Sequence, residues 1–125
     1  MNYKQFNAFC KALPATTYVM QWGDSHVWKV GGKVFVIGGW AVDQESYSFK
    51  TTEMDFEILK DQPGLRPAPY LASRGLKWIQ HYGEPGLNDR QLRNYIELSY
   101  RLVAKGLSKK LRAELGIDIS SNDAR

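Results

Sequence analysis

The chain has 125 residues, of which 43% are hydrophobic and 13% aromatic, a composition that suits one compact domain with its own core. The formal net charge is +4 and the pI about 9.2, a mild basic bias that permits nucleic-acid binding without requiring it. No segment approaches the roughly 20 apolar residues of a membrane-spanning helix, and the N-terminus opens on an amphipathic pattern instead of a signal-peptide core. We expect a soluble, cytoplasmic protein with one domain, residues 1–117, and a flexible tail, residues 118–125.

The first half of the chain has the pattern of one helix followed by antiparallel strands. Asn2 is a capping residue, apolar residues then recur at helical spacing, and Pro14 marks the end of the helix. Alternating apolar residues predict strands over residues 16–22 and 46–50, each bounded by turn-forming residues. This half is therefore expected to form an antiparallel meander.

The segment 26–37 is the most informative stretch, because two alternating apolar runs flank Gly31-Gly32. A Gly-Gly pair suits the positive-φ positions of a type I′ turn, so we expect a two-residue β-hairpin. Lys29 and Lys33 would lie near its exposed tip. The facing pairs expected in this register are Val30 with Lys33, Trp28 with Phe35, and His26 with Ile37.

The second half of the chain is mainly helical. It predicts a short helix over residues 52–61, a proline-rich loop over 63–69 and a strand over 77–82. A long helix follows, with Asn88 and Gln91 as its capping box, and Ser108 caps a final short helix. The expected fold class is α+β, with the N-terminal, middle and C-terminal helices packed on one antiparallel sheet.

Sequence patterns for catalysis or metal binding are not evident. His26 and His81 have no Cys, Asp or Glu at metal-ligand spacing, and the glycines do not match a phosphate-binding loop. Cys10, the single cysteine, lies on the apolar side of the first helix and is expected in the core. We therefore expect a noncatalytic protein with no cofactor and no metal.

Aromatic and basic residues are the remaining candidates for binding. The alternation of apolar residues along the strands favours core packing for Trp22, Trp28, Trp40 and Trp78. Stacking on nucleic-acid bases is the alternative, and Trp40, which follows a glycine pair, is the best candidate for it. Positive charge is concentrated between residues 101 and 115. A joint basic face would attract phosphates irrespective of sequence. Its expected members are Lys29, Lys33, Lys50, Lys105, Lys109, Lys110 and Arg112.

An ordered series of short motifs resembles the MmcQ/YjbR family of small bacterial proteins, over about residues 3–115. The motifs are Trp22-Gly23, the hairpin from Trp28 to Phe35, Ser48-Phe49-Lys50, Pro69-Tyr70-Leu71, Lys77-Trp78 and Ser99-Tyr100-Arg101-Leu102-Val103. The resemblance implies a frataxin-like (CyaY-like) α+β fold and DNA binding through a double-wing arrangement. By position it adds Lys77 to the candidate phosphate contacts, beside Lys29, Lys33 and Lys50.

This chain departs from the family pattern at two places. Gln21 precedes Trp22-Gly23 where the family often has a proline before Phe-Gly, and Thr51-Thr52 replaces a cysteine-proline or aspartate-proline pair. These departures weaken the transfer of any single ligand contact and leave the fold expectation intact.

Three functional hypotheses follow. The first is a noncatalytic DNA-binding protein, a monomer or weak homo-oligomer, that contacts phosphates with little base readout. The second is a protein-interaction or small-ligand-binding module that uses a sheet face and the loop 63–75 around Arg66, Tyr70 and Arg74. The third, from fold analogy alone, is iron binding by the acidic residues Glu53, Asp55, Glu57 and Asp61.

Overall fold

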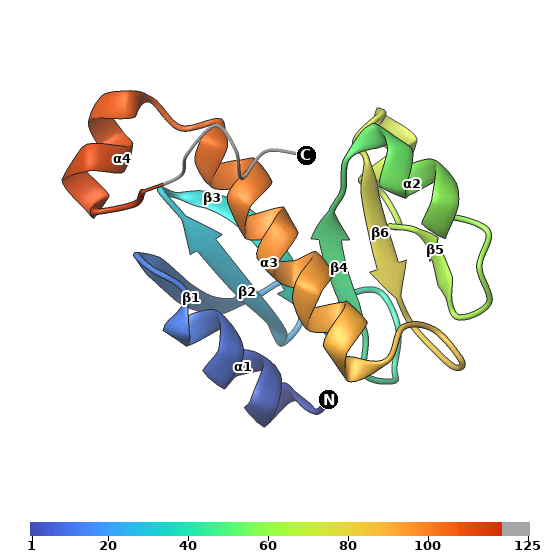
Figure 1. Ribbon diagram of the computed structural model, residues 1–125. Helices are drawn as coiled ribbons and strands as arrows, with labels where there is room; N and C mark the ends of the chain where they lie inside the picture. The colour runs from blue at the N-terminus through green and yellow to red at the C-terminus, as the bar shows by residue number, and fades with distance from the viewer. Residues whose placement is uncertain (119–125) are drawn as a thin grey trace.

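Helices cover one face of a six-stranded antiparallel sheet in the computed structural model, which describes residues 1–118 (Figure 1). The strands are β1 (Thr16–Gln21), β2 (Ser25–Val30), β3 (Lys33–Gly38), β4 (Tyr47–Lys50), β5 (Leu65–Pro67) and β6 (Trp78–His81). The helices are α1 (Tyr3–Ala12), α2 (Glu53–Leu59), α3 (Asp89–Lys105) and α4 (Lys109–Leu115), with a 3-10 turn at Ala72–Arg74. The strand order is β1-β2-β3-β4-β6-β5. The α+β fold predicted from the sequence is confirmed, and the predicted tail lies, from residue 119 onward, outside the described residues.

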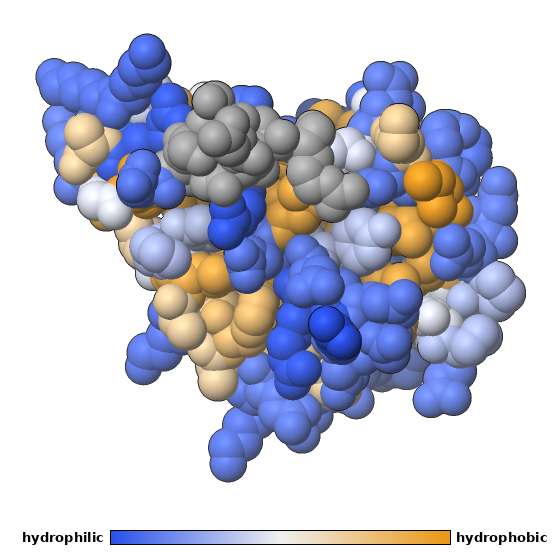
Figure 2. Space-filling view, viewed as in Figure 1, coloured by the Kyte–Doolittle hydropathy of each residue, from blue (hydrophilic) through white to orange (hydrophobic). Residues whose placement is uncertain are grey.

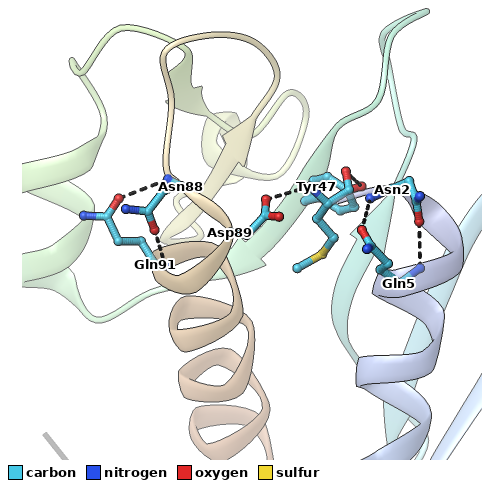
Figure 3. A network of polar contacts seen from close by, with 7 residues as sticks. Asn2, Gln5, Tyr47, Asn88, Asp89 and Gln91 are labelled. Atoms are coloured by element: carbon cyan, nitrogen blue, oxygen red, sulfur yellow. Dashed lines mark hydrogen bonds and ion pairs between the residues drawn. The ribbon is translucent and has the colours of Figure 1, made fainter.

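Side-chain caps start the four helices where the sequence predicts them. The side chains of Thr52 and Ser108 cap α2 and α4, and α1 and α3 each begin with a capping box. The two capping boxes lie close together (Figure 3), because the Met1 amino group contacts Asp89 Oδ1 at 2.6 Å. Tyr47 Oη of β4 donates to the Met1 carbonyl, which ties both helix starts to the sheet.

The main core lies between the sheet and the helices, with α3 running diagonally across β3 and β4 (Figure 1). Its fully buried large side chains include Phe6 of α1, Phe49 of β4 and Ile96 of α3. Cys10 is also fully buried, and burial raises the pKa of its thiol, so its predicted core role is confirmed.

A smaller apolar cluster lies on the other side of the sheet, which we call the second face. It consists of Val27, Ile37, Ala68 and Trp78, with Val34, Trp40 and Leu71 packed against it. Ala68 and Leu71 belong to the segment between β5 and β6, so this segment and Trp40 partly cover the second face.

The Gly31-Gly32 hairpin is confirmed, with φ values of +59° and +81° at the two glycines. The register beyond the tip was predicted wrongly. Val30 faces Lys33, but Trp28 faces Val36 and His26 faces Gly38, because a β-bulge makes Phe35 an extra residue. The bulge lets Phe35 and Val36 both enter the main core, where both are fully buried.

The proline-rich segment was predicted as loop, yet Leu65–Pro67 forms the edge strand β5, paired with β6. An edge strand needs hydrogen bonds on one side only, so Pro67 is tolerated there. Among residues 1–118, no helix has both the length and the apolar character needed to cross a membrane.

Candidate functional site

Six of the eight candidate phosphate-binding residues lie at one end of the molecule. They belong to the β2–β3 hairpin, the end of α3 and helix α4. The contact between Leu107 and Gly31 brings the end of α3 onto the hairpin tip; a Cβ on Gly31 would lie 2.5 Å from Leu107 Cδ1. Lys29 and Lys33 flank the tip, and Lys105 lies at the end of α3. The α4 members of the set are Lys109, Lys110 and Arg112.

Lys50 and Lys77 lie at the same end of the sheet. Val36 faces Phe49, so Lys50 is level with the bulge near the hairpin tip, and Lys50 in turn faces Trp78. Lys77 immediately precedes Trp78. We call the eight residues together the basic end. Hydrophilic side chains project from the molecule at α4, in the upper left of Figure 2.

The basic end spans both faces of the sheet instead of one. Lys29 and Lys50 alternate with core residues and lie on the second face. Lys33 faces Val30 of the main core, and Lys77 lies 4.9 Å from the ring centroid of Phe56, so both are on the helix-covered side. The cations therefore lie at one end of the molecule but on both faces of the sheet, so the joint basic face expected from the sequence is not formed by these four lysines.

Most members of the basic end are free to meet a ligand. Lys33, Lys50, Lys105, Lys109 and Lys110 are exposed. In the part of the chain that the structure describes, none of the eight forms a salt bridge within 4.0 Å. Lys29, Lys77 and Arg112 are half-buried, and the Nε of Arg112 is buried with no hydrogen-bond partner among the described residues.

Acidic residues of α2 lie beside one part of the basic end. The hydrogen bond from Lys60, 2.8 Å away, lowers the pKa of the Glu57 carboxyl, and the Lys77 charge adds to this effect. Asp55 is buried. Over residues 1–118, no group of three or more His, Cys, Asp and Glu side chains is placed to hold a metal ion, so the iron hypothesis gains no support there.

Three aromatic rings form a row beside the second face. The ring centroid of Trp40 is 6.0 Å from that of Trp22 and 5.7 Å from that of Tyr70. Trp22 is 50% exposed and Tyr70 is 68% exposed, whereas Trp28 and Trp78 are buried. The prediction of core packing is thus confirmed for Trp28 and Trp78 and wrong for Trp22, because Trp22 begins the β1–β2 turn.

The backbone of the aromatic row is strained. Trp22 and Tyr70 of the row have φ values of +54° and +68°, and Ala41, next to Trp40, has +64°; this left-handed region costs non-glycine residues about 1–3 kcal/mol each. Such strain persists where the surroundings enforce it, often at binding sites. The sequence marked Trp40 as a candidate for stacking and Tyr70 as part of a candidate binding loop, but it did not predict that these rings and Trp22 lie side by side.

Arg66 lies near the row through a chain of side-chain hydrogen bonds. Its Nε donates to Gln80 Oε1 at 2.9 Å, and Gln80 Nε2 donates to the Trp40 carbonyl at 2.6 Å. The guanidinium also stacks over the Tyr82 ring, 4.8 Å from its centroid. These two contacts hold the Arg66 side chain in one orientation.

Comparison with known proteins identifies the family. The YjbR family model matches residues 11–102. The chain belongs to the YjbR family. No curated protein matches it.

Two solved structures share the YjbR-family fold seen here. The crystal structure of Deinococcus radiodurans protein DR2400, with a DUF419 domain, has a TM-score of 0.80 at 22% identity, covering 99% of this chain and 91% of that one. A Pseudomonas syringae protein has a TM-score of 0.65 at 20% identity, covering 82% of this chain and 99% of that one. At these identities the likeness is one of fold.

The YjbR match divides the basic end into two parts. It includes Lys29, Lys33, Lys50 and Lys77 and stops before Lys105 and α4. Helix α4, which carries three of the eight cations, lies outside the residues that the family model matches.

Proposed function

We propose that this YjbR-family protein is a noncatalytic DNA-binding protein that contacts phosphates through its basic end. The observation that carries the proposal is the convergence of cations from distant parts of the chain around one hairpin tip. Sequence-independent attraction of Lys and Arg to phosphates dominates this kind of binding.

The arrangement favours backbone contacts over base readout. Lys29 and Lys33 leave the hairpin on opposite sides of the sheet, as in a wing that meets phosphates on both of its sides. Lys105 and the α4 lysines extend the same charge beyond the tip. The proposal requires no protein group to enter the major groove.

The test is fluorescence anisotropy with a labelled DNA duplex at low salt, comparing the wild type with Lys29→Ala/Lys33→Ala. If both lysines neutralise phosphates, the slope of log K against log salt becomes shallower by up to ~1.8. Lys4→Ala/Arg90→Ala is the matched control, since it removes the same charge at the helix starts, away from the hairpin. Absence of wild-type binding would refute the proposal, and equal effects of the two double variants would remove the hairpin from it.

A second candidate function, binding of a small planar ligand, is favoured by the strained aromatic row. Two exposed rings and the fixed guanidinium of Arg66 suit a planar ring that carries a negative charge. Titration of tryptophan fluorescence with adenosine monophosphate and with adenosine tests this function. Quenching of the fluorescence by adenosine monophosphate, lost in Trp22→Ala and in Arg66→Gln, would support this function. An unchanged wild-type spectrum would exclude this class of ligand.

A further inference from the structure

The two edges of the sheet are built differently. The edge strand β5 has three residues and contains Arg66 and Pro67, two features that discourage pairing with another strand. The other edge strand, β1, has six residues, Thr-Thr-Tyr-Val-Met-Gln, with neither a charge nor a proline. Within residues 1–118, β1 pairs with β2 alone, so its outward backbone groups are unpaired on the other side.

Apolar side chains line both sides of this edge. Tyr18 is 42% exposed, Val19 37% and Met20 51%. Tyr18 and Met20 face Trp28 and His26 of β2 on the α1 side, whereas Val19 faces Val27 on the second face. Exposed apolar groups beside an unpaired strand edge are characteristic of a surface that adds another strand.

We propose that β1 pairs with β1 of a second copy of this chain, forming a two-fold symmetric dimer with a continuous twelve-stranded sheet, twice the six strands of one chain. A two-fold axis perpendicular to the sheet makes the strands antiparallel and sets residues of the same face opposite each other. Val19 then faces Val19 of the second copy, and Tyr18 faces Met20, a favourable sulfur–aromatic contact.

The chemistry of the edge selects this occupant. An unpaired strand edge is complementary to another extended backbone, and self-pairing of an uncharged strand sets no like charges opposite one another. Binding of a nucleic acid to this strand is disfavoured, because residues 16–21 contain no cation to attract phosphates. On the α1 side, an open hollow of about 530 Å³ bordered by Ala8, Lys11 and Tyr18 separates part of α1 from the edge strand.

The test is sedimentation velocity of the full chain over a range of concentrations, with amide hydrogen exchange as a second readout. We expect a concentration-dependent dimer and slower exchange across residues 16–21 as it forms. Val19→Lys should give a monomer at every concentration, because two charges would then face each other across the axis. Ile58→Lys is the matched control, an exposed apolar residue on α2, and should leave the dimer unchanged.

Val19→Glu, which sets two carboxylates opposite each other at the same exposed position, provides a second charged variant should Val19→Lys fail to fold. A wild type that stays monomeric up to its solubility limit overturns the proposal. A dimer that persists in a folded Val19 variant, or whose exchange protection lies outside residues 16–21, also overturns it. The proposal is independent of DNA binding, because none of its variants removes a member of the basic end.

Discussion

Ser99 shows how one buried hydroxyl joins α3 to the sheet where strand pairing is interrupted. Its Oγ donates to the Phe35 carbonyl at 2.6 Å and accepts from the Lys50 backbone N–H at 2.8 Å. Phe35 is the bulged residue of β3, so its carbonyl lacks a regular ladder partner. The resemblance to the MmcQ/YjbR family already marked Ser99, and the structure assigns it a packing and hydrogen-bonding role.

Replacing Ser99 with alanine should lower the free energy of unfolding by about 2–4 kcal/mol, because two buried backbone groups would lose their partner. Urea denaturation measures this change. Ser73→Ala is the matched control: its hydroxyl donates to the Tyr70 carbonyl at an exposed site, and the expected loss is below about 0.5 kcal/mol. Similar losses in both variants would contradict the role assigned to Ser99.

His81 should make stability depend on pH near neutrality. Burial lowers the pKa of its imidazole, the N-terminal ammonium adds to the effect, and Asp89 opposes it. The unfolded chain therefore binds the proton more readily, so the stabilisation is complete above about pH 6.5 and is lost as the pH falls below it. Urea denaturation should show this decline in the wild type and a flatter profile in His81→Gln; parallel profiles would exclude His81 as the cause.

At the scale of elements, the β2–β3 hairpin and the α3–α4 connection form one unit. Gly31 and Gly32 both have positive φ, but only at Gly31 would a Cβ collide with Leu107. Gly32→Ala should cost about 1–2 kcal/mol from the backbone alone. Gly31→Ala should cost more, because Leu107 must also move. Thermal unfolding of the two variants gives the order, and an equal or reversed order would show that this contact contributes little.

The elements also show where sequence reasoning succeeds. Caps at Asn2, Asn88 and Ser108 predicted helix starts correctly because each cap acts on a backbone group two or three residues away. The strand β5 was missed because Pro67 argues against a strand unless that strand lies at an edge, and edge position depends on the whole sheet.

At the scale of the molecule, α4 should contribute to DNA affinity together with the hairpin. Lys109→Ala/Lys110→Ala removes two exposed cations and should reduce the salt slope by up to ~1.8. The measurement is anisotropy across a salt series, with Lys4→Ala/Arg90→Ala as the control of equal charge. An unchanged slope would show that Lys109 and Lys110 do not neutralise DNA phosphates.

The proposed dimer would change the geometry of this binding. Antiparallel pairing of two β1 strands directs the two hairpin tips toward opposite ends of the assembly. The two basic ends would then engage separate duplexes, or distant parts of one, instead of adjacent half-sites.

Local sequence patterns were enough to predict the helix caps, the Gly-Gly turn, the alternation of the strands and the core position of Cys10. These depend on contacts a few residues apart or on the periodicity of apolar side chains. The bulge at Phe35, the exposure of Trp22 and the arrangement of the basic residues at one end of the molecule became visible only in the folded chain. Each of these depends on segments far apart in the chain, as when Ser99 meets Phe35 or Leu107 meets Gly31.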